Sequence, residues 1–75
     1  MDAEVAKLFA AAIAVSVGCA APAIAQGLMA KQTFESIGRN PSVQDGIFGK
    51  MVIAMAITES LGIYSLVIAL LILFV

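Results

Sequence analysis

The chain has 75 residues, of which 63% are hydrophobic and 12% are charged, and its formal net charge is −1. A soluble domain of this length needs a polar exterior, so this composition excludes one and favours a small membrane protein. The charge balance provides no basic surface for nucleic acid. The sequence has no histidine and a single cysteine, which excludes a structural zinc site and an internal disulfide.

The first long apolar segment covers residues 8–30, in which Ser16 and Gln26 are the only polar side chains. At about 1.5 Å of rise per residue, a helix of this length spans a bilayer core of about 30 Å. Small residues occupy every second position from 10 to 20, and positions two apart lie about 200° round a helix. Two small flanks favour a helix packed between neighbours on both sides, as in a closed ring. An alanine-rich helix in an ordinary small bundle is the alternative.

The same segment has a second interpretation as a signal peptide, because Lys7 precedes an apolar stretch that ends in an alanine-x-alanine pattern before Gln26. The acidic start of the chain is unlike a basic leader, and cleavage leaves a single span with an unpartnered Glu59. A lipoprotein signal at Cys19 is disfavoured by Ser16, which stands where a bulky aliphatic residue is expected. We therefore predict that this segment is the first of two spans and that Cys19 is a small packing residue.

Turn-forming residues occupy the polar segment between the two apolar segments. Pro41 biases Asn40 away from helical geometry, so the sequence predicts a turn near this pair. The basic residues Lys31, Arg39 and Lys50 flank the turn, and the positive-inside rule then places the loop in the cytoplasm and both termini outside. The expected fold is all-α: a single hairpin with a first helix over about 3–38, a polar loop over about 39–45 and a second helix over about 46–75.

The second apolar segment, residues 51–75, contains Glu59 as its only ionisable side chain apart from the Tyr64 phenol. A charge at the middle of a bilayer costs about 2.5–3.5 kcal/mol, so such a carboxylate is usually neutral, paired or part of an ion path. Counting outward from the turn at about 1.5 Å per residue puts Gln26 and Glu59 at nearly the same depth. We predict that they meet, because burying either alone is unfavourable. Gly62 leaves space beside Glu59.

Other oxygen atoms near Glu59 complete a candidate ion-binding site. The Ser60 hydroxyl, the Tyr64 phenol and the Ile57 backbone carbonyl are expected to join Gln26 there, although Tyr64 has an alternative role as a packing aromatic. Desolvation favours the protonated form of a carboxyl, and hard cations such as sodium prefer oxygen ligands, so either occupant neutralises the site. The sequence contains no nucleophile–base pair, phosphate-binding loop or cofactor motif, so we expect neither catalysis by this chain alone nor a cofactor.

Three motifs resemble the c subunit, or proteolipid, of F-type ATP synthases. They are Ala-Pro-Ala-Ile-Ala-Gln-Gly ending at Gly27, Gly-Arg-Asn-Pro ending at Pro41 and Glu-Ser-Leu-Gly-Ile-Tyr ending at Tyr64. The resemblance covers almost the whole chain. It implies a helical hairpin whose identical copies form a rotor ring in the bacterial inner membrane, surrounded by lipid, with the carried ion at Glu59. The ring is expected to turn against subunit a, whose arginine is the counter-charge.

The resemblance also assigns the loop and the packing face of the first helix. The loop residues Arg39, Asn40 and Pro41 are implied to meet the central stalk of the catalytic head. The glycine repeat that the family usually carries on the first helix is replaced here by four larger residues, and we expect a larger ring because each added methyl widens the helix. These residues are Cys19, Ala21, Ala23 and Ala25.

A second departure concerns the transported ion. Sodium-type members of the family resemble this chain at Gln26, Glu59 and Ser60, but they usually have a hydroxyl where it has Leu61. We therefore expect a proton as the transported ion. The same ring coupled to sodium at Glu59, Gln26 and Ser60 is the first alternative. A two-span structural or accessory protein, in which Gln26 and Glu59 merely lock two helices together, is the second.

Overall fold

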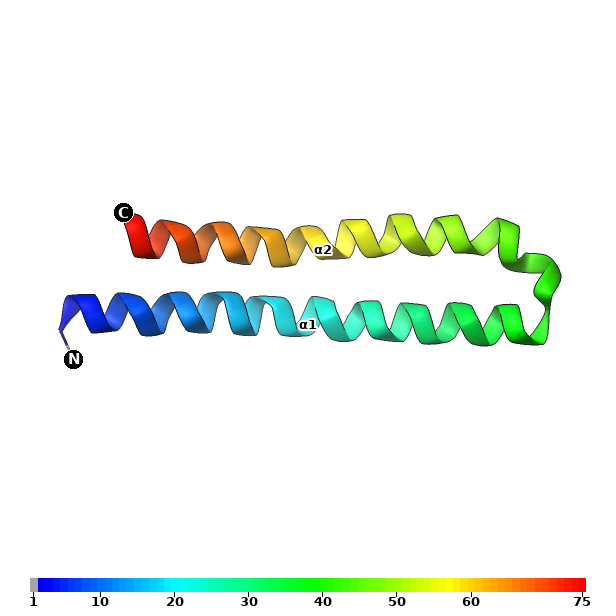
Figure 1. The fold of residues 1–75 in the computed structure, drawn as a ribbon, viewed down its shortest axis with the longest axis horizontal. Coiled ribbons are helices and arrows are strands. Elements are labelled where there is room, and N and C mark those ends of the chain that lie inside the picture. The colour runs from blue at the N-terminus through cyan, green and yellow to red at the C-terminus, as the bar shows by residue number, and fades with distance from the viewer. Residues whose placement is uncertain (1) are drawn as a thin grey trace.

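The structure is a computed structural model and describes residues 2–75. Two long helices, α1 (Ala3–Arg39) and α2 (Gln44–Phe74), are joined by a short 3-10 turn (Pro41–Val43). The helices lie antiparallel and side by side, so that both chain ends lie at one end of the molecule and the turn lies at the other (Figure 1). The predicted helical hairpin is confirmed.

Local hydrogen bonds explain where the first helix begins and ends. The Asp2 carboxylate accepts a hydrogen bond of 2.8 Å from a backbone N–H of the first turn of α1, as an N-cap does. Asn40 leaves helical geometry at φ −144° and ψ 85°, and its N–H donates to the Ser36 carbonyl at 3.0 Å. Pro41 then opens the turn, where its missing N–H leaves no bond unmade. The turn is shorter than the polar loop expected over about 39–45, because α2 begins directly after it.

The two helices contact each other along a seam of small side chains. Its buried positions are Ala11 and Pro22 on α1 and Gly62 and Ala69 on α2. Within residues 2–75 no large side chain is fully buried, and large apolar side chains are exposed along both helices. A surface of this kind is stable only when lipid or neighbouring protein covers it.

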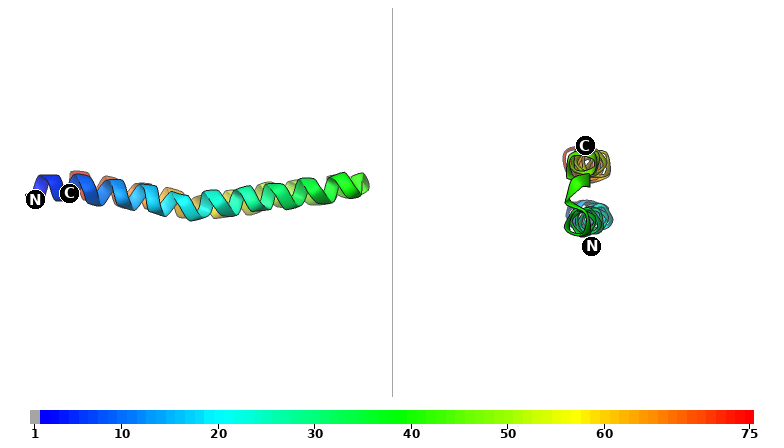
Figure 2. Two further views of the ribbon diagram at one scale, coloured as in Figure 1. Left: turned by 90° about the horizontal axis from the view of Figure 1, so that it is seen from below. Right: turned by 90° about the vertical axis from the view of Figure 1, so that its right-hand side faces the viewer.

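Both helices are long and apolar enough to cross a membrane, judged by length and composition. At about 1.5 Å per residue, helices of 37 and 31 residues exceed a hydrocarbon core of about 30 Å, so the polar turn end projects beyond it. Seen from the side, the two helices bend together about midway along their length (Figure 2, left). Pro22 lies in this part of α1 and removes one backbone hydrogen bond, which accounts for a bend there.

Candidate ion-binding site

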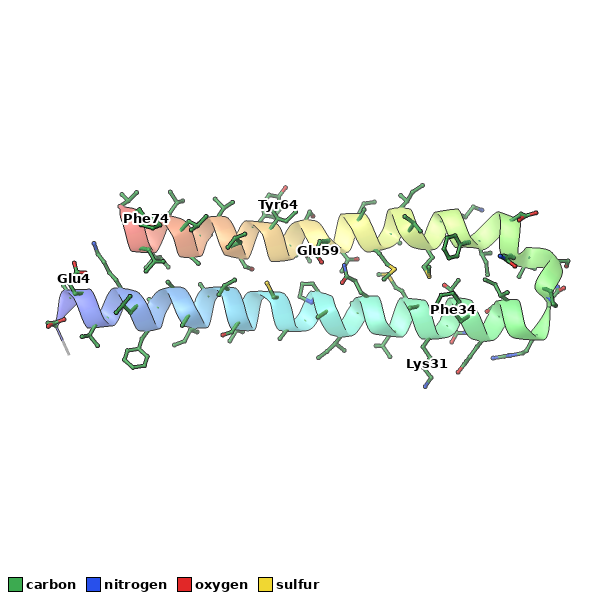
Figure 3. All side chains as sticks on the ribbon, viewed as in Figure 1. Glu4, Lys31, Phe34, Glu59, Tyr64 and Phe74 are labelled. Carbon is green, nitrogen blue, oxygen red and sulfur yellow. The ribbon has the colours of Figure 1, made fainter. Side chains whose placement is uncertain are left out.

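The structure brings Gln26 of α1 and Glu59 of α2 together at mid-height of the hairpin. The Gln26 amide nitrogen donates to Glu59 Oε2 at 2.8 Å and to the backbone carbonyl of Met55 at 3.1 Å. Figure 3 shows Glu59 on the side of α2 that faces α1. Both amide protons of Gln26 therefore have acceptors on α2, and the amide is fixed in one orientation.

Met55 belongs to this site, and the sequence analysis did not predict it. Its contribution is a backbone carbonyl, which every residue type carries, so no side-chain pattern points to it. The only available signal is position, because Met55 lies one helical turn before Glu59 and therefore on nearly the same face of α2. Once Glu59 is chosen, the residue four positions earlier is the natural second partner for an amide from α1.

The remaining oxygen groups have hydrogen-bond partners other than Glu59 within one hairpin, or are exposed. The Ser60 hydroxyl donates to the Ile57 carbonyl at 2.5 Å, so these two groups bond to each other within α2. Thr58 likewise donates to the Ala54 carbonyl of its own helix at 2.9 Å. Tyr64 is 65% exposed. Within one copy of the chain, the hydrogen bonds at the site join Gln26 to Glu59 and to a backbone carbonyl, and the rest of the five-group cluster stays a prediction.

Gly62 provides the space beside the carboxylate. A Cβ added at Gly62 would lie 3.6 Å from Glu59 Oε1 and 3.5 Å from the Cys19 sulfur. The Cys19 thiol, half-buried in the seam, lies 3.8 Å from the Gly62 carbonyl oxygen. A larger residue at position 62 would therefore crowd both the thiol and the free oxygen of Glu59.

A second close approach lies further toward the chain ends. A Cβ added at Gly18 would overlap the Ser65 side chain, so the two backbones can be this close only because Gly18 has no side chain. The Ser65 hydroxyl donates to the Leu61 carbonyl at 3.0 Å. The sequence shows Gly18 as one small residue among many, and only the position of α2 reveals which of them lies at the contact.

The alanines expected to pack helices together divide between two surfaces. Ala25 is half-buried beside α2, whereas Ala21 and Ala23 are exposed on the single hairpin. Exposed small residues on α1 are available to a neighbouring helix. At the turn, Arg39 and Glu35 form an exposed ion pair at 3.4 Å, and the Asn40 side-chain oxygen accepts a hydrogen bond of 2.6 Å from Ser42.

Comparison with known proteins matches residues 9–72 to the family of ATP synthase C subunits. The chain belongs to this family. An ATP synthase c subunit of Dehalococcoides mccartyi is 39% identical over 75 residues, covering 100% of this chain and 99% of the relative. An ATP synthase c subunit of Pelobacter propionicus is 43% identical over 67 residues (89% and 74%), and that of Petrotoga mobilis is 38% identical over 69 residues (92% and 72%).

Membership of this family defines the role of the hairpin. It is a two-span membrane protein and an ion-translocating, non-catalytic rotor component of ATP synthase. Its copies assemble in a ring with one another and with the other proteins of the complex. The alternative of an accessory protein, in which Gln26 and Glu59 only lock two helices, is therefore set aside.

Proposed function

We propose that the ring carries protons and that Glu59 takes up and releases one proton as it rotates. The observation that carries this proposal is the orientation of Gln26, whose amide nitrogen faces both the Met55 carbonyl and Glu59. A sodium ion requires several oxygen ligands, and the group that Gln26 directs at α2 is its N–H donor and not its oxygen. A proton requires only the carboxylate and an acceptor.

The second oxygen of Glu59 is the place for that proton. Oε2 accepts from Gln26, while Oε1 lies beside the open position at Gly62. Protonation at Oε1 removes the charge and keeps the bond from Gln26, so the neutral site matches the low dielectric of lipid. Release of the proton requires a polar or cationic environment, which the counter-charge of subunit a supplies in this proposal.

The groups missing from the site in one hairpin lie where an adjacent copy can provide them. Ile57 and Leu61 each lie two positions from Glu59 and thus about 200° round α2, on the opposite face of the hairpin. In a ring of side-by-side hairpins, Ile57 and Leu61 of one copy face Glu59 of the next. An apolar Leu61 in that place disfavours a sodium cage and leaves a dry environment for a protonated carboxyl. Ser60 and Tyr64 border this second face.

The proposal also places the hairpin relative to its partners. The turn at Arg39, Asn40 and Pro41 contacts the central stalk, and the basic residues at that end keep it on the cytoplasmic side with both termini outside. The exposed apolar side chains of α2 contact lipid and, once per rotation, subunit a. These contacts follow from the rotor role and from the polar character of the turn end.

Labelling with a hydrophobic carbodiimide tests the site and the ion together. The reagent attacks a protonated carboxyl, so we expect Glu59 to be modified in the intact ring, with no change in rate when tens of millimolar sodium chloride are added at fixed pH. Protection by sodium, but not by potassium at equal ionic strength, would contradict the proton assignment. The Glu4→Gln variant is the matched control, because it removes an exposed carboxylate at the far end of α1 (Figure 3) and should leave labelling unchanged.

A further inference from the structure

Two open grooves lie between the helices, one near each end of the hairpin. The first, here called the turn-end groove, has a volume of about 660 Å³ and is lined by residues that include Met29, Gln32, Lys50 and Ala54. The second, the termini-end groove, has a volume of about 280 Å³ and is lined by residues that include Ala12, Leu66 and Leu70. Apolar side chains dominate both, and no part of the hairpin itself fills either.

The two grooves open on opposite faces of the hairpin. Ala25 and Gln26 are half-buried neighbours, about 100° apart round α1, and therefore flank the seam on opposite sides. Gln26 reaches Glu59, whereas Ala25 lines the turn-end groove. On α2, Lys50 lines that groove. It lies nine positions from Glu59, which puts the two side chains about 180° apart round the helix. The turn-end groove is thus on the face away from Glu59.

Each groove has an exposed apolar side chain opposite it at the same height. Phe48 lies eleven positions from Glu59, about 20° away round α2, and Phe34 lies two positions from Gln32, about 200° away round α1, so both are on the face away from the turn-end groove. Phe48 is 45% exposed and Phe34 is 56% exposed. Figure 3 shows Phe34 near the turn end of α1.

The same relation holds at the other end of the hairpin. Ile68 lies between Leu66 and Leu70, two positions from each, and is 51% exposed. Since Leu66 and Leu70 line the termini-end groove, Ile68 projects from the opposite face. One face therefore has a groove at the turn end and a projection at the termini end, and the other face has the reverse.

Charges follow the same division. Asp45 lies three positions from Phe48, about 60° away, and so shares its face, whereas Lys50 lies on the groove side. Among residues 2–75 the only ion pair is Arg39 with Glu35, which leaves Asp45 and Lys50 free for a partner. An acidic group on one face and a basic group on the other attract when identical chains stand side by side in the same direction.

We propose that neighbouring copies in the ring dock in parallel and at one height, with Phe48 and Phe34 of one copy in the turn-end groove of the next. Ile68 of that next copy enters the termini-end groove of the first. This heterologous contact joins unlike faces, as a closed ring requires. It rests on the ring assembly of the proposed function and not on the identity of the ion. An antiparallel neighbour joined through unlike faces would bring projections against projections.

Compensating changes in size test this docking. Phe48→Ala should lower the temperature at which the purified ring dissociates in SDS, and so should Ala54→Leu, which fills the groove. The double variant should dissociate at a higher temperature than either single variant. Phe48 and Ala54 are six positions apart and about 120° round α2, so they do not meet within one helix, and coupling between them reports contact between copies. Ile53→Ala is the control, because Ile53 is 62% exposed on the side of α2 away from α1.

Two outcomes would overturn the docking proposal. The first is a dissociation temperature of the double variant that is lowered by the sum of the two single effects. The second is a dissociation temperature of Ile53→Ala that is lowered as much as that of Phe48→Ala. Carbodiimide labelling of Glu59 in the same rings separates this proposal from the function. If labelling is intact and coupling is absent, only the docking fails; if coupling is present and Glu59 is inert, only the proposed ion site fails.

Discussion

The two halves of the hairpin pack differently, and the ion site lies between them. From Pro22 and Gly62 toward the chain ends, the seam contains every buried residue of the described chain and the contact at Gly18, where an added Cβ would overlap Ser65. Toward the turn, longer side chains such as Met29 and Met51 line a groove of about 660 Å³ between the helices. The termini half fixes the relative height of the helices, while the turn half provides surface for a neighbour.

The largest loss of stability is expected from a substitution that disrupts the termini half, where the helices pack most closely on small residues. Gly18→Val would place side-chain atoms where Ser65 now lies, at the upper end of the about 1–3 kcal/mol that overpacking costs. SDS titration of the purified ring should show this loss, and Ser65→Gly in the same chain should restore part of it. Gly49→Val is the matched control, because a Cβ at Gly49 meets nothing within 4 Å. Equal losses at positions 18 and 49 would contradict the difference between the halves.

Removing the Gln26 amide, which lies between the termini half and the turn half, should have the next largest effect. Gln26→Leu removes the hydrogen bonds that the amide donates to the Glu59 carboxyl and to the Met55 carbonyl, and a typical hydrogen bond contributes about 0.5–1.5 kcal/mol. Since Glu59 itself is retained, we expect slower proton transport by the reconstituted complex and not its loss. Gln44→Leu, which removes an exposed amide at the start of α2, serves as the control. Unchanged transport in Gln26→Leu would mean that the amide plays no part in the site.

This boundary also shows what a sequence can and cannot predict. The meeting of Gln26 and Glu59 follows from counting, because a helix has a constant rise and the turn fixes the starting point. The placement of Ser60 and Tyr64 could not be found in this way, since α2 is apolar on all sides and carries no stripe that shows which face turns to α1. The grooves and the Gly18 contact depend on which small residues meet, and that is decided by helix rotation.

A smaller effect is expected where copies adjoin. Ala21 and Ala23 are exposed on the hairpin, so shortening both to glycine lets neighbouring first helices come closer. The double change Ala21→Gly with Ala23→Gly should yield a ring of fewer copies, counted by native mass spectrometry. The same substitution at Ala3, outside the first apolar segment, should leave the count unchanged. A larger count in the double variant would contradict the expected widening by methyl groups.

The smallest effect is expected at the turn. The ion pair between Arg39 and Glu35 is exposed on both sides, and such pairs contribute less than about 1 kcal/mol. Glu35→Gln should therefore leave the SDS resistance of the ring nearly unchanged, at low and at moderate ionic strength. A loss as large as that of Gly18→Val would show that the turn, and not the termini half, fixes the height of the helices.

The central claim is that one carboxyl between these halves binds and releases the transported ion. Proton transport by the reconstituted complex carrying Glu59→Gln, compared with Glu4→Gln, tests it most directly. We expect the Glu59 variant to assemble a ring of normal size and to transport no protons, while the Glu4 variant transports them normally. Proton transport at an undiminished rate by the Glu59→Gln complex would contradict it.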